Sequence, residues 1–113
     1  MIVDPEADGA TAVFALLHAA GGSLPRALLS LAHSAMLPDA SPREAWGRPM
    51  GYARSCGAIV EDYDAATVSL AADHELTRSM LAALAECPDT MARARRALAK
   101  GRRAHALLAR RAP

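Results

Sequence analysis

The feature that most limits how this chain can fold is its excess of alanine and leucine over β-branched and aromatic residues. Of the 113 residues, 28 are Ala and 14 are Leu, whereas Ile and Val together occur six times and Phe, Trp and Tyr together four times. Ala and Leu favour helices, and β-branched and aromatic residues favour strands. The composition strongly disfavours a sandwich or barrel and predicts a single all-α domain over residues 1–113.

Turn and capping residues divide the chain into four expected helices. The first is expected at 9–20, before a Gly-Gly pair, and the second at 23–37, before Pro38. Apolar residues at alternating spacings of three and four predict a third helix over 52–86 and a fourth over 89–111. The expected architecture is a small helical bundle.

The third expected helix is long for a domain of this size. A continuous helix over 52–86 would extend roughly 52 Å. We therefore expect a break near Gly57 or near 61–64, or a helix that protrudes and pairs with another chain. The short connection at 87–88 predicts that the third and fourth helices form a C-terminal antiparallel helical hairpin.

Residues 9–37 carry a single charged side chain, Arg26, and their apolar residues are spread all around both expected helices. A helix that is apolar on most sides must be covered on most sides. The sequence leaves three possibilities open for this segment, namely the core of the monomer, a homodimer interface and a site for another protein. Of these, a homodimer is expected. The candidate partner-binding residues are Val13, Phe14, Leu17, Leu24, Leu28, Leu31, Trp46, Met50 and Tyr52.

Charge is distributed unevenly although the net charge is only +1. Residues 88–113 carry a net charge of +7, and residues 1–87 carry −6. Neutralisation within the chain or across a dimer is the favoured interpretation, and contact with an acidic or nucleic-acid partner is the alternative. The candidate basic patch consists of Arg93, Arg96, Lys100, Arg103 and Arg110.

No residue pattern in the chain is typical of catalysis or of metal binding. No histidine is paired with another at i+4, and none has a carboxylate three residues before it, which excludes the zinc-hydrolase and di-iron helix motifs. The acidic cluster of Glu61, Asp62 and Asp64 has no neighbouring histidine and is interpreted as a solvated helix face. Cys56 and Cys87 form no CxxC pair. We expect no catalytic residues, no metal and no cofactor.

The chain begins without a cationic leader, and its apolar stretches near 12–22 and 27–37 are shorter than the roughly 20 residues that span a bilayer. We expect a cytoplasmic protein with no membrane partner. Its preference for Arg over Lys, 12 to 1, is typical of a GC-rich bacterial genome. The sequence predicts a non-enzymatic protein-binding regulator of the anti-activator, adaptor or chaperone type, for example in transcription regulation. The alternative is a nucleic-acid-binding regulator that uses the Arg-rich C-terminal helix.

Overall fold

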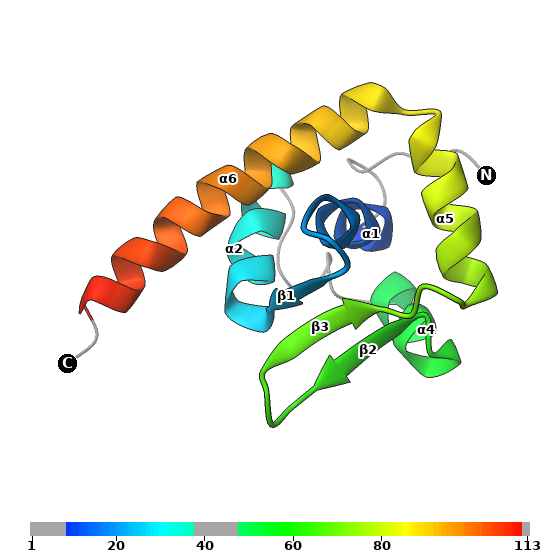
Figure 1. Cartoon of the computed structure of the whole chain (residues 1–113), viewed down its shortest axis with the longest axis horizontal. Helices are drawn as coiled ribbons and strands as arrows, with labels where there is room; N and C mark the ends of the chain where they lie inside the picture. The colour runs from blue at the N-terminus through cyan, green and yellow to red at the C-terminus, as the bar shows by residue number, and fades with distance from the viewer. Residues whose placement is uncertain (1–8, 38–47, 112–113) are drawn as a thin grey trace.

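Five helices and a three-stranded antiparallel sheet make up residues 9–37 and 48–111, the part of the chain that this computed structural model describes (Figure 1). The predicted all-α class is therefore wrong, because the protein is mixed α/β. In chain order the elements are α1 (Gly9–Ala19), β1 (Ser23–Pro25), α2 (Arg26–Met36), α4 (Arg48–Cys56), β2 (Ile59–Asp62), β3 (Thr67–Leu70), α5 (Glu75–Ala85) and α6 (Pro88–Arg111).

The sheet has the order β1-β3-β2, so that β3 pairs with both neighbours. In the β2–β3 hairpin Ile59 lies opposite Leu70 and Asp62 opposite Thr67. Side chains alternate between the two faces of a strand, and Ile59 and Val68 are the buried members of β2 and β3. The sheet therefore adds β-branched side chains to the core, while the turn of the hairpin projects into solvent (Figure 1).

The third expected helix is broken at Gly57, as predicted, but the chain beyond the break is not helical. Gly57 has a φ of +88°, and the amides of Ala58 and Gly57 bond to the carbonyls of Ala53 and Arg54 at 3.0 and 3.2 Å. This pair of bonds is the Schellman motif, in which a glycine in the left-handed region ends a helix. The prediction that the rest of 52–86 is helical beyond the break is therefore wrong, since the β2–β3 hairpin separates α4 from α5.

The same motif ends α1, where the Gly-Gly pair was predicted to stop the helix. Gly21 and Gly22 have positive φ angles, and their amides bond to the carbonyls of His18 and Leu17 at 3.1 and 2.7 Å. That prediction is confirmed. The predicted start of the second helix at residue 23 is wrong, because Ser23–Pro25 pairs with β3 and the helix begins at Arg26.

Helix α1 lies in the middle of the molecule, with the other helices and the sheet around it (Figure 1). Residues 11–17 are all buried, which explains why this helix is apolar on every side. Helix α6 packs across α2 and α1 rather than along α5. The predicted C-terminal antiparallel helical hairpin is therefore wrong, since α5 and α6 diverge from the turn between them (Figure 1). The predicted long C-terminal helix is present.

A glycine sets the distance between α2 and α6. A Cβ atom added at Gly101 would lie 2.9 Å from the backbone nitrogen of Ala32 and 3.0 Å from its Cα. Only a residue without a side chain fits this contact, because backbone atoms cannot turn aside as a side chain can. The close approach fixes the position of α6 against α2 and therefore also the position of the basic side chains of α6.

Candidate functional site

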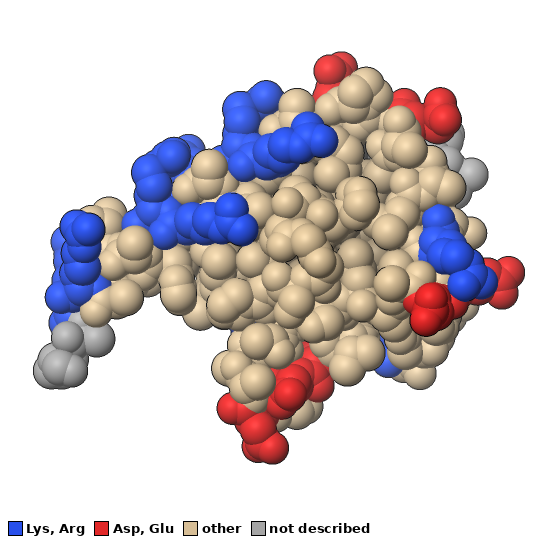
Figure 2. Space-filling view, in the orientation of Figure 1, with Lys and Arg blue, Asp and Glu red and all other residues tan. Residues whose placement is uncertain are grey.

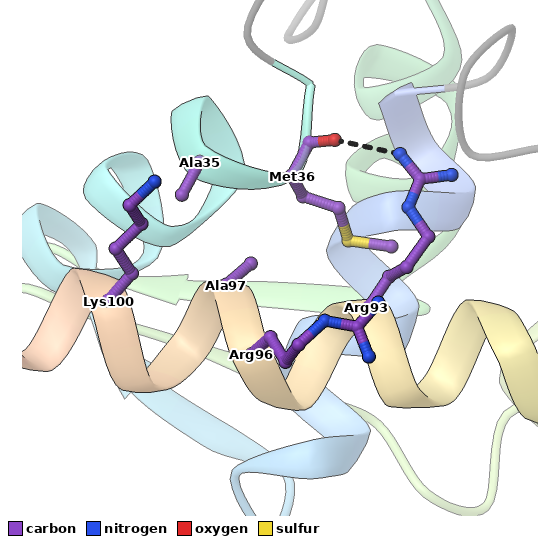
Figure 3. A pocket seen from close by; sticks show the side chains of 6 residues that line it. All are labelled: Ala35, Met36, Arg93, Arg96, Ala97 and Lys100. Carbon is purple, nitrogen blue, oxygen red and sulfur yellow. Dashed lines mark hydrogen bonds between the residues drawn. The ribbon is translucent and has the colours of Figure 1, made fainter.

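Three cationic side chains of α6 stand along the contact between α6 and α2. The buried, small Ala97 and Gly101 bring the two backbones together. Arg93, Arg96 and Lys100 lie at the edge of this contact and line an open groove of about 360 Å³ (Figure 3). The other lining residues are Ala35, Met36 and Ala97.

Arg93 holds the end of α2 against α6. Its Nη2 donates a hydrogen bond to the carbonyl oxygen of Met36 at 3.3 Å (Figure 3). Met36 is the last residue of α2, where the carbonyls lack helical partners and carry the negative end of the helix dipole. Arg93 is half-buried, whereas Arg96 and Lys100 are exposed. We conclude that Arg93 serves the fold and that the other two cations face solvent.

A line of arginines follows the outer side of α6. Arg96, Arg103 and Arg110 recur every seven residues, opposite the buried Ala94 and Gly101, and all three are exposed. Seven residues of α-helix rise about 10 Å, so these side chains form a nearly straight basic line. The line is flanked by further exposed cations: Arg95, Lys100, Arg102 and Arg111. Four of the seven cations lie beyond Gly101, on the part of α6 that projects from the body (Figure 1).

These cations are not neutralised within the described part of the chain. The two salt bridges found there both end at Glu61, which contacts Arg26 at 3.5 Å and Arg54 at 3.1 Å. None of the seven exposed cations of α6 forms a salt bridge with a described acidic residue. Basic side chains follow α6, whereas acidic ones gather on the β2–β3 hairpin and on the turns that flank α5 (Figure 2).

The acidic cluster expected on a helix face lies instead on the hairpin. The side chain of Glu61 is only 10% exposed and ties the hairpin to α2 and α4 through its two arginines. The guanidinium of Arg26 also lies 4.8 Å from the ring centre of Tyr63. Asp62 closes the turn, because its Oδ1 accepts a hydrogen bond from the amide of Ala65 at 3.0 Å. These contacts build the hairpin and do not form an acid–base pair.

Most of the candidate partner-binding residues lie inside the molecule. Their burial follows from the central position of α1 and from the packing of β1 and α2 against it. Leu31 is half-buried, and Tyr52 on α4 is 67% exposed. Trp46 lies outside the described residues, as does the side chain of Met50. The fully buried members are Val13, Phe14, Leu17, Leu24 and Leu28.

Within residues 9–37 and 48–111 no group of three or more His, Cys, Asp or Glu side chains is placed to hold a metal ion. Both cysteines, Cys56 and Cys87, are free. In the same part of the chain no helix is long and apolar enough to cross a membrane. No protein-family model, curated protein or solved structure matches this chain.

Four exposed apolar side chains that are not among the residues predicted from the sequence lie on two projecting segments. Val60 and Tyr63 lie on the hairpin, and Leu107 and Leu108 lie near the end of α6. The signal for the hairpin was present, because three of the six Ile and Val residues fall within residues 59–68. No sequence signal distinguished Leu107 and Leu108 from the buried leucines of the other helices.

Proposed function

We propose that this protein is a nucleic-acid-binding regulator that lays the outer face of α6 along a phosphate backbone. The observation that carries the proposal is the line of Arg96, Arg103 and Arg110, which is exposed and forms no salt bridge with a described acidic residue. Arginine binds phosphate through a planar fork of donors, and release of counterions from a duplex favours such contacts.

Two further features support a polyanionic ligand. The acidic hairpin lies on another side of the molecule from the outer face of α6, so that a duplex approaching α6 does not meet it (Figures 1 and 2). The apolar side chains that a protein-binding role would use on α1 and α2 are buried in the core. We propose that the protein is cytoplasmic, where such a ligand is available, and that it binds this ligand without catalysing a reaction.

The proposal is tested by fluorescence anisotropy with a labelled duplex of random sequence. Binding should weaken steeply with salt, because the logarithm of the binding constant falls by about 0.9 for each neutralised phosphate per tenfold rise in salt. The variant Arg96→Ala/Arg103→Ala should bind more weakly, with a salt slope smaller by about 2. Arg78→Ala on α5 is the matched control for the single variants Arg96→Ala and Arg103→Ala, since Arg78 is exposed but lies on a different helix.

Two results would contradict the proposal. One is a wild-type dissociation constant above about 10⁻⁴ M at physiological salt, which is weaker than ordinary non-specific binding. The other is an equal loss of affinity in Arg78→Ala and in the single variants Arg96→Ala and Arg103→Ala, which would show that overall charge, and not the face of α6, determines binding.

A protein-binding regulator of the anti-activator, adaptor or chaperone type is the second candidate. It is favoured by Tyr52, which is 67% exposed on α4, on the opposite side of α1 from α6 (Figure 1). Exposed tyrosines are frequent anchors of protein interfaces. Affinity capture from the native host, read by mass spectrometry, should recover a partner with the wild type and lose it with Tyr52→Ala. Recovery of the same proteins by both would contradict this second role.

A further inference from the structure

Two projecting segments carry four of the five large apolar side chains that are exposed among the described residues. We call residues 102–111 of α6 the tail and residues 60–66 the hairpin tip. Leu107 and Leu108 on the tail are each 56% exposed, and Val60 and Tyr63 on the hairpin tip are 50% and 74% exposed. Both segments project from the body toward the same side, and the molecular outline recedes between them (Figures 1 and 2).

The tail extends the buried face of α6 beyond the body that covers it. Ala94 and Gly101 are buried, and Leu108 follows at the same spacing of seven residues. Leu108 therefore lies on the face that packs against α2 earlier in the helix, yet it is exposed because α6 runs past α2 (Figure 1). Arg102 and Arg111, both exposed, stand on the two sides of this uncovered face.

The hairpin tip offers the complementary surface. Asp62 and Asp64 are exposed and form no salt bridge with a described basic residue, whereas Glu61 is already engaged by two arginines. Tyr63 stands between the two exposed aspartates. The tip thus combines an apolar ring with two negative charges, and the tail combines two leucines with positive charges.

The charges of the tail and the hairpin tip indicate which of these surfaces can form a contact. Two tails side by side would bring arginine against arginine, and two hairpin tips would bring aspartate against aspartate. A tail against a hairpin tip pairs opposite charges and covers apolar side chains on both. No salt bridge joins the tail to the described acidic residues of its own chain, so the tail is available to the hairpin tip of a second copy.

We propose that two copies of this chain form a two-fold dimer in which the tail of each docks on the hairpin tip of the other. In such an isologous arrangement the same contact occurs twice. Each contact therefore needs to bury only half of the roughly 1,200–2,000 Å² that is typical of a stable interface. Arg96, Arg103 and Arg110 stay on the outer face of α6, so the dimer is compatible with the proposed nucleic-acid contact and does not depend on it.

The proposal is tested by sedimentation equilibrium without nucleic acid, using two charge variants. The tail variant is Arg102→Glu/Arg111→Glu. The hairpin variant is Asp62→Asn/Asp64→Lys, in which Asn keeps the side-chain oxygen that closes the turn. The wild type should have twice the chain mass at micromolar concentration, and each variant alone should be a monomer because its contacts become repulsive.

Mixing the two variants in equal amounts gives the decisive result. Both contacts of the mixed dimer are again complementary, so dimers should reappear. Arg103→Glu/Arg110→Glu is the matched control, with the same charge change in the same segment but on the outer face, and should remain dimeric. Leu108→Ser should dissociate the dimer without any change of charge. Circular dichroism verifies that each variant is folded, as expected from the exposure of every changed position.

The proposal is overturned if the wild type is monomeric, if either charge variant dimerises like the wild type, or if the mixture stays monomeric. Loss of the dimer in the control variant would also overturn it, because the interface would then lie on the outer face of α6.

Discussion

Replacing Gly101 by alanine should destabilise the protein, although alanine is the better helix former. The new Cβ atom would lie 2.9 Å from the backbone nitrogen of Ala32 and 3.0 Å from both its Cα and its Cβ. Two of these three atoms belong to the backbone, so relief requires α2 and α6 to move apart. Overpacking of this kind costs about 3 kcal/mol at the upper end of its usual range.

The gain in helix propensity offsets about 1 kcal/mol of that cost. The free energy of unfolding should therefore fall by about 2 kcal/mol, which corresponds to a decrease of about 10 °C in the melting temperature. Urea denaturation followed by circular dichroism, at one fixed protein concentration, measures the change.

Two companion variants make the test specific. Gly51→Ala in α4 should be neutral or stabilising by up to about 1 kcal/mol, because no atom lies within 4 Å of the position of its new Cβ. Ala32→Gly should rescue Gly101→Ala only in part, since the nitrogen and Cα of residue 32 remain in place. Unchanged or increased stability of Gly101→Ala would refute the close contact between α2 and α6.

Three further substitutions test the core and the contacts of the hairpin. Leu17→Ala, at a fully buried position of α1, should lower the free energy of unfolding by about 2–5 kcal/mol in urea titrations. His74→Ala should cost about 1–2 kcal/mol in the same assay, because the imidazole caps α5 and also bonds to the carbonyl of Cys56 at 2.8 Å. Glu61→Gln should cost only about 1 kcal/mol, since both arginine partners are more than a third exposed, and should speed amide hydrogen exchange in the hairpin.

Local sequence signals predicted helix ends better than they predicted strands. The glycines at 21, 22 and 57 marked helix ends because left-handed backbone is costly for other residues, and this local rule does not depend on the rest of the fold. The strands could not be recognised from the overall composition, because they comprise only eleven residues in a chain dominated by Ala. The four β-branched residues in 59–68 were a local signal, but the regular apolar spacing over 52–86 also fitted a helix.

Only part of the candidate site could be predicted from the sequence. The spacing of Arg96, Arg103 and Arg110 places them on one helix face regardless of tertiary structure. Whether Phe14 and Leu17 face solvent or the core depends on how many elements surround α1, and the sheet that completes this enclosure was not expected. The pairing of α6 with α2 could not be predicted either, because the spacing of Met91, Ala94, Leu98 and Gly101 marks the buried face of α6 but does not specify which helix covers it.

The most direct test of the account is an NMR titration of the isotopically labelled protein with a short duplex. Because the outer face of α6 is proposed to follow the phosphate backbone, the largest shift changes should lie on α6 between Arg96 and Arg110. They should vanish when salt is raised and remain absent from residues 62–66 of the hairpin. Changes centred on α4 and the hairpin, with α6 unaffected, would contradict the proposed role of α6.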